Sequence, residues 1–211
     1  MKKIDVCNIP WFMISIDNRR FNRTCELFEH FDLKKPTKFT GFTFSNMPTA
    51  AKIMVANLAL VKMAKALEYD AVFIFEDDAY PCDGIKEKLQ DISEVPDDCK
   101  VLDLGWIKNS NPPSKEQFVR PNGNHMFGEH SYVVFKDGYE DFENYFKTTN
   151  INADWIFWHP IPGIYYYKEN LFVQYNAEES NSMHYGYIYG DGFGHDDPPE
   201  GYTKIENILN K

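Results

Sequence analysis

An unbroken apolar run at residues 71–75 leads directly into three carboxylates, Glu76, Asp77 and Asp78. A short run of this kind predicts a strand that is covered by protein on both faces. Such strands are typical of α/β folds, in which helices cover both sides of a central sheet. The carboxylates follow where the strand ends, which is the position where these sheets usually bind ligands.

The rest of the chain alternates between strand-like and helix-like segments. Strands are predicted at residues 11–16, 38–44, 71–75, 101–104 and 131–135. Helices are predicted at residues 21–31, 49–67, 85–92 and 137–146. This order predicts an α/β fold with a mainly parallel central sheet flanked by helices. Residues 164–167 and 171–175 are typical of a strand pair, and residues 106–127 of a long loop.

Length and charge limit the possible partners. The 211 residues carry a formal net charge of -10. This length predicts one domain, in which residues 1–182 are expected to form the main body and residues 183–211 a C-terminal segment. An acidic chain without a dense basic run is not expected to bind nucleic acid.

The sequence predicts a cytoplasmic location and leaves peripheral membrane association open. No apolar run reaches the ~20 residues of a membrane span, and the basic start is not followed by a signal-peptide pattern. The four cysteines have no C-x-x-C spacing, so reduced thiols in the core are expected.

Three adjacent carboxylates repel one another, and a divalent cation removes that cost. Hard oxygen ligands suit Mg²⁺ or Mn²⁺, which commonly bridge carboxylates and substrate phosphates. Alternate side chains of an extended segment face the same side, so Glu76 and Asp78 are expected to share one ion. A solvated acidic turn is the alternative interpretation.

Residues 71–79 resemble the strand and acidic motif of glycosyltransferase family 25, which includes lipooligosaccharide and collagen galactosyltransferases. Further segments resemble that family in the same order and together cover about residues 11–182. They are an opening strand with arginines at 12–23, a segment at 130–138, an aspartate motif at 152–155 and a closing stretch at 171–182.

The resemblance implies a GT-A-like nucleotide-diphospho-sugar transferase fold. It also implies inverting transfer of a hexose, such as galactose, from a UDP-sugar to a surface-glycan acceptor, as in lipopolysaccharide biosynthesis. Mn²⁺ or Mg²⁺ would join Glu76 and Asp78 to the donor diphosphate, with His184 as a further ligand. No covalent cofactor is implied. For His184 alone, an ordinary surface histidine is the alternative.

The resemblance also assigns roles to other residues. The nucleotide site would comprise Asp17, Arg19, Arg20, Arg23, Glu76 and Asp77. Arginine suits phosphate because its guanidinium forms bidentate contacts, although surface charge is the alternative here. An inverting transferase needs a base that deprotonates the acceptor hydroxyl, and Asp154 is the candidate. A helix-capping role is the alternative for Asp154.

Two other functions remain open. Residues 57–60 lack the Ser-His pair that the family usually carries there, which favours a catalytically inactive relative that binds a nucleotide or a glycan. A nucleotidyltransferase also uses carboxylates and Mg²⁺, but residues 17–23 contain no glycine for a phosphate-binding loop. The sequence therefore favours a metal-dependent glycosyltransferase.

Overall fold

The computed structural model describes residues 1–44, 46–47, 49–105, 107–108, 116–120, 126–127, 130–148 and 162–174. The candidate residues Asp154 and His184 lie outside these ranges, as does the expected C-terminal segment 183–211.

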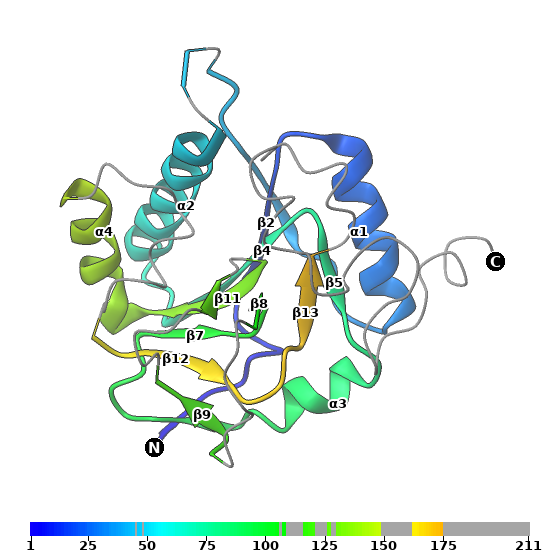
Figure 1. Cartoon of the computed structure of the whole chain (residues 1–211), viewed down its shortest axis with the longest axis vertical. Helices are drawn as coiled ribbons and strands as arrows, with labels where there is room; N and C mark the ends of the chain where they lie inside the picture. The colour runs from blue at the N-terminus through cyan, green and yellow to red at the C-terminus, as the bar shows by residue number, and fades with distance from the viewer. Residues whose placement is uncertain are drawn as a thin grey trace.

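A central sheet forms the middle of the described part of the chain (Figure 1). Its seven strands are β2 (Trp11–Ser15), β3 (Thr37–Thr40), β4 (Ala71–Glu76), β7 (Val101–Asp103), β9 (Phe118–Val119), β11 (Ser131–Phe135) and β12 (Ile164–Tyr167). They lie in the order β3-β2-β4-β11-β7-β12-β9. The apolar run that precedes the three carboxylates is β4, and it lies inside the sheet, as the sequence predicts.

The sheet is mixed, so the expectation of a mainly parallel sheet is not confirmed. The pairs β2–β3, β2–β4 and β7–β12 are parallel. The pairs β4–β11, β7–β11 and β9–β12 are antiparallel. A strand that is covered on both faces shows the same apolar run whichever way it points, so the sequence pattern carries no information on direction.

Four helices in the described residues agree with the predicted positions: α1 (Asn18–His30), α2 (Thr49–Ala66), α3 (Ile85–Gln90) and α4 (Tyr139–Thr148). Helix α1 begins earlier than its apolar spacing predicts, because Asp17 caps it. The carboxylate of Asp17 accepts hydrogen bonds from the backbone N–H of Arg19 at 2.7 Å and of Arg20 at 3.3 Å. Residues 18–20, which lie between the predicted strand 11–16 and the predicted helix 21–31, therefore form the first turn of α1.

The two faces of the sheet have different cores. Helices α1 and α3 cover one face, where aromatic rings pack in edge-to-face and tilted contacts. This aromatic cluster comprises Trp11, Phe28, Phe73, Phe75 and Phe172. Helices α2 and α4 cover the other face, where Leu60 and Phe142 are fully buried (Figure 1). Both faces of the central strands are thus buried, which explains their continuous apolar runs.

Short strand pairs complete the described structure: β1 (Lys2–Lys3) with β6 (Glu94–Val95), β5 (Ala79–Pro81) with β13 (Phe172–Gln174), and β8 (Ile107–Lys108) with β10 (Met126–Phe127). The expected pairing of residues 164–167 with 171–175 is wrong, because β12 joins the central sheet and β13 pairs with β5. The described residues of the expected loop 106–127 include three two-residue strands, which are too short to produce an alternating pattern.

No helix in the described ranges has both the length and the apolar character that a bilayer span requires. All four cysteines are free, and Cys25, Cys82 and Cys99 are buried, which agrees with the expected core thiols.

Candidate active site

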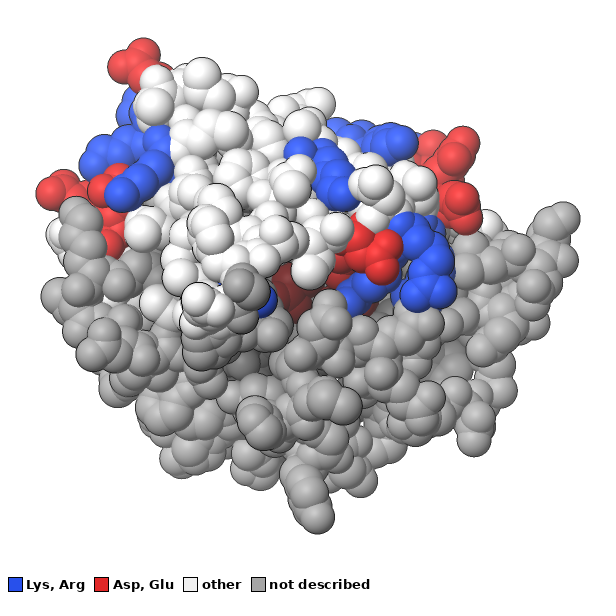
Figure 2. Space-filling view, turned by 90° about the horizontal axis from the view of Figure 1, so that it is seen from above, with Lys and Arg blue, Asp and Glu red and all other residues white. Residues whose placement is uncertain are grey.

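One edge of the central sheet gathers the polar residues that follow the strands. The carboxyl ends of β2, β3, β4 and β7 lie at this edge, together with the amino end of β11. Glu76 ends β4, Asp103 ends β7, and His130 immediately precedes β11. Viewed toward this edge, acidic and basic side chains lie next to one another around a hollow (Figure 2).

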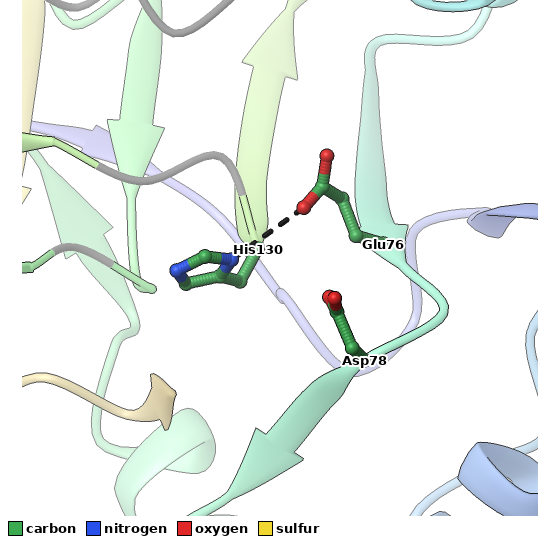
Figure 3. A group of neighbouring side chains, drawn as sticks. All are labelled: Glu76, Asp78 and His130. Carbon is green, nitrogen blue, oxygen red and sulfur yellow. Dashed lines mark ion pairs between the residues drawn. The ribbon is translucent and has the colours of Figure 1, made fainter. Parts of the chain in front are cut away.

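Glu76, Asp78 and His130 form what we call the three-ligand cluster. Each offers one ligand atom, and these atoms all lie within 4.8 Å of one another. The Nδ1 atom of His130 lies 3.5 Å from Oε2 of Glu76 (Figure 3). The two residues are opposite each other on neighbouring strands, because the N–H of Glu76 donates to the carbonyl of His130 at 3.0 Å. A carboxylate pair with a buried imidazole is a donor set that a divalent metal accepts.

Asp78 reaches the cluster through a turn and not through an extended segment. The chain turns at Asp77 and Asp78 before β5 begins, so the alternation expected of an extended strand does not apply. The turn places the Asp78 carboxylate on the same side as Glu76 and His130 (Figure 3). We refer to residues 76–78 as the acidic turn.

Asp77 is not a member of the three-ligand cluster and pairs with Arg20. The Nη2 atom of Arg20 lies 2.6 Å from Oδ1 of Asp77 and 3.0 Å from Oδ2 of Asp78. Burial raises the pKa of Asp77 to about 6, while Arg20 and a hydrogen bond from Ser15 act to lower it. The acidic turn is therefore partly neutralised by the chain itself, which the sequence argument for a cation did not consider.

The other predicted nucleotide-site residues lie at the start of α1. Asp17 is the helix cap, and the pKa of its carboxylate is lowered chiefly by the N–H of Arg19. Arg19 is exposed and Arg23 is half-buried. Thr24, one turn after Arg20, donates from its hydroxyl to the backbone carbonyl of Asp77 at 2.6 Å. Helix α1 therefore contacts the acidic turn directly.

Asp103 is a buried carboxyl group at this edge that the sequence reasoning missed. It is fully buried, its Oδ1 accepts from the N–H of Gly105 at 3.0 Å, and its Oδ2 has no hydrogen-bond partner among the described residues. Burial raises the pKa of Asp103 well above its usual range. Its charge within an apolar strand was the signal that could have identified it.

The buried carboxyl group of Asp103 predicts a pH-dependent stability that Asp103→Asn removes. In the folded chain the group stays protonated above its unfolded pKa of 3.8. Its stabilising contribution to the free energy of unfolding is therefore complete below that pH and falls as pH rises. Relative to wild type, the variant should gain up to about 1.4 kcal/mol per pH unit above that point. Urea unfolding at pH 5, 6 and 7 measures this gain.

Asp91→Asn, on the exposed surface after α3, is the control and should show a constant difference from wild type. A constant difference for Asp103→Asn as well would mean that Asp103 titrates like a surface carboxylate.

Gly105 allows β7 to approach β11 beside His130. A Cβ atom at Gly105 would lie 2.5 Å from Oγ and 2.9 Å from the backbone N of Ser131, and 3.3 Å from Cβ of His130. Gly105→Ala is therefore expected to displace the start of β11, to destabilise the fold by about 1–3 kcal/mol and to weaken the proposed binding of Mn²⁺ at the three-ligand cluster at least ~10-fold. Calorimetric titration with Mn²⁺ and thermal unfolding check the two effects.

Gly84→Ala is the control that separates the loss of stability from the loss of Mn²⁺ affinity. Gly84 has a φ of 69°, which alanine rarely adopts, and it lies outside the three-ligand cluster. It should lower stability by about 1–2 kcal/mol and leave Mn²⁺ affinity unchanged. Equal Mn²⁺ affinities for both alanine variants would show that Gly105 does not position His130.

A mixed sheet between helical layers defines an α/β fold, and this fold is of the kind found in a glycosyltransferase. The structure is similar to that of a glycosyltransferase involved in the glycosylation of the major capsid of PBCV-1. The TM-score is 0.54 and the sequence identity 12%, over 80% of this chain and 93% of that chain. At this identity the similarity establishes the fold alone.

A second solved structure, A197 from STIV, has a TM-score of 0.42 and 11% identity, over 79% of this chain and 93% of that chain. A TM-score this low carries no argument. No family model matches this chain, and no curated protein sequence matches it.

Proposed function

We propose that this chain is a metal-dependent glycosyltransferase that moves a hexose from a UDP-sugar to a glycan acceptor. The observation that carries the proposal is the three-ligand cluster at the carboxyl edge of a sheet whose fold is found in a glycosyltransferase. Two carboxylates and one imidazole suit Mn²⁺, with Mg²⁺ as the alternative ion.

The dimensions of the cluster support this assignment. Opposite ligands of one such ion lie about 4.2 Å apart, because each metal–oxygen bond is about 2.1 Å long. Adjacent ligands lie about 3.0 Å apart for the same bond length. The ligand atoms of Glu76, Asp78 and His130 lie within 4.8 Å of one another, so each pair would close by less than about 2 Å around one ion. When bound, the cation would stabilise negative charge on the diphosphate leaving group.

Residues of α1 complete the proposed donor site. Arg19 and Arg23 lie on the helix that contacts the acidic turn, and their guanidinium groups suit phosphate oxygens. Asp154 is proposed as the base that deprotonates the acceptor hydroxyl in an inverting reaction, and His184 as a further metal ligand. Galactose as the donor sugar, membership of family 25, a role in lipopolysaccharide biosynthesis and a cytoplasmic location belong to the same proposal.

A catalytically inactive relative is the second candidate, and one contact favours it. Asn57 lies in α2 within the stretch where family 25 carries its Ser-His pair. It is buried, and its side-chain oxygen accepts a hydrogen bond from the hydroxyl of Tyr132. A residue engaged in this way links α2 to β11 and is not positioned to act on a substrate.

Thermal unfolding with Mn²⁺, with UDP and with both tests the proposal. A ligand at 100 times its Kd stabilises the folded state by about 2.7 kcal/mol, which raises Tm by several degrees. We expect a large shift only when both ligands are present, and EDTA should abolish it. Release of hexose from UDP-galactose then distinguishes an active transferase from a binding relative.

Two results would contradict the proposal. A shift with a nucleoside triphosphate and none with UDP would indicate a nucleotidyltransferase. The absence of a shift with any nucleotide in the presence of Mn²⁺ or Mg²⁺ would exclude a nucleotide-sugar site.

A further inference from the structure

We infer that Arg20 is the built-in countercharge of the acidic turn: it pairs with Asp77 and with one oxygen of Asp78, and so holds the turn in place for a divalent cation at Glu76, Asp78 and His130. Arg20 is thus a positioning residue and not a phosphate ligand. The role of the cation rests on the proposed function, whereas the ion pairs of Arg20 do not.

The contacts of Arg20 are short and largely removed from water. One nitrogen of its guanidinium lies 2.6 Å from Asp77 and 3.0 Å from Asp78. The side chains of Arg20, Asp77 and Asp78 are only 10%, 11% and 5% exposed. Ion pairs in such surroundings are weakly screened by salt, and removal of one partner leaves a buried charge without compensation.

Helix α1 holds both parts of the acidic turn. The Asp17 cap fixes the first turn of the helix, from which the Arg20 side chain reaches the Asp77 and Asp78 carboxylates. Thr24 lies four residues later, on the same face of the helix, and bonds to the Asp77 carbonyl. Side chain and backbone of Asp77 are therefore both anchored to α1, whereas Asp77 is not a member of the three-ligand cluster.

The charge count agrees with this division. The three carboxylates and one guanidinium carry a formal charge of -2, which one divalent cation balances. Without Arg20 the turn would carry three negative charges within a partly buried site. We therefore expect Glu76, Asp78 and His130 to be held ready for an ion before any ion binds.

Arg20→Gln tests the inference, with Arg19→Gln as the matched control at the neighbouring exposed position. Without ligands, Arg20→Gln should lower Tm by about 10 °C, whereas Arg19→Gln should change it by less than ~2 °C. Mn²⁺ alone should then raise Tm more in Arg20→Gln than in wild type, because the ion replaces the lost positive charge. Arg20→Lys should recover part of the loss.

Asp77→Asn covers the case in which Arg20→Gln does not fold. It keeps the shape of Asp77, and it should retain Mn²⁺ affinity within about threefold, since Asp77 is not assigned to the ion. The double variant Arg20→Gln/Asp77→Asn should show a decrease in Tm that is clearly smaller than the sum of the decreases in the two single variants.

The opposite pattern would overturn the inference. An Arg20→Gln variant with unchanged ligand-free Tm and weakened UDP binding would make Arg20 a phosphate ligand. Loss of Mn²⁺ binding in Asp77→Asn would make Asp77 a metal ligand. If wild type binds no Mn²⁺, the proposed function fails, but the ligand-free Tm values still decide whether Arg20 holds the turn.

Discussion

Replacing Asp78 with asparagine is expected to lower the proposed hexosyl transfer by about 10³-fold, equivalent to ~4 kcal/mol of transition-state stabilisation. Asparagine keeps the shape of the side chain but removes the negative charge that attracts the proposed cation. Asp78 is only 5% exposed and belongs to the three-ligand cluster, so no bulk water replaces the lost ligand. The rate of hexose release from UDP-galactose, measured over a range of Mn²⁺ concentrations, gives both the rate and the metal affinity.

Asp91→Asn removes an equivalent charge from the exposed surface after α3 and should leave the rate unchanged. Glu76→Gln should behave like Asp78→Asn, since Glu76 contributes another atom to the same cluster. An Asp78→Asn variant that keeps more than a third of the wild-type rate with the same Mn²⁺ dependence would remove Asp78 from the site.

The elements that the sequence predicts well are those decided by local pattern. The apolar run before the three carboxylates is β4, and the long apolar segment at residues 49–67 is α2 within one residue. Both depend on side-chain spacing over a few turns or a few residues, which is visible without knowledge of distant partners. The start of α1 depends on Asp17 as its cap, a role that the sequence analysis did not give to Asp17.

Strand partners could not be predicted, because they depend on contacts between distant segments. Nothing local in the sequence of β13 distinguishes pairing with β5 from pairing with β12. The same holds for the site. His130 meets Glu76 only because β11 lies antiparallel to β4. The histidine that the sequence analysis names as a ligand, His184, lies outside the described residues.

The countercharge of the acidic turn also comes from a distant segment of the chain. Like-charge repulsion in the acidic turn is a sound physical reason to expect a cation. The sequence also contains an arginine that can supply part of that charge, but its spacing of 57 and 58 positions from Asp77 and Asp78 gives no hint of contact. Arg20 was therefore interpreted as a phosphate ligand, and its place between the two carboxylates becomes visible only in three dimensions.

The aromatic cluster beneath α1 carries the second large expected effect. Phe73→Ala should lower the free energy of unfolding by about 3–5 kcal/mol, because it removes a fully buried ring. The ring lies 4.1 Å from that of Phe75, 5.2 Å from that of Trp11 and 5.9 Å from that of Phe172, centroid to centroid. Urea unfolding followed by tryptophan fluorescence measures the loss.

Phe44→Ala is the matched control, because Phe44 is 55% exposed and its removal should cost less than about 0.5 kcal/mol. Phe73→Ala should leave the Mn²⁺ affinity of the folded chain intact. Successive residues of a strand point to opposite faces, so Phe73 and Glu76 face different sides of β4. A loss of Mn²⁺ affinity that accompanied the loss of stability would show that the aromatic face positions the acidic turn, and that fold and site are not separable along this strand.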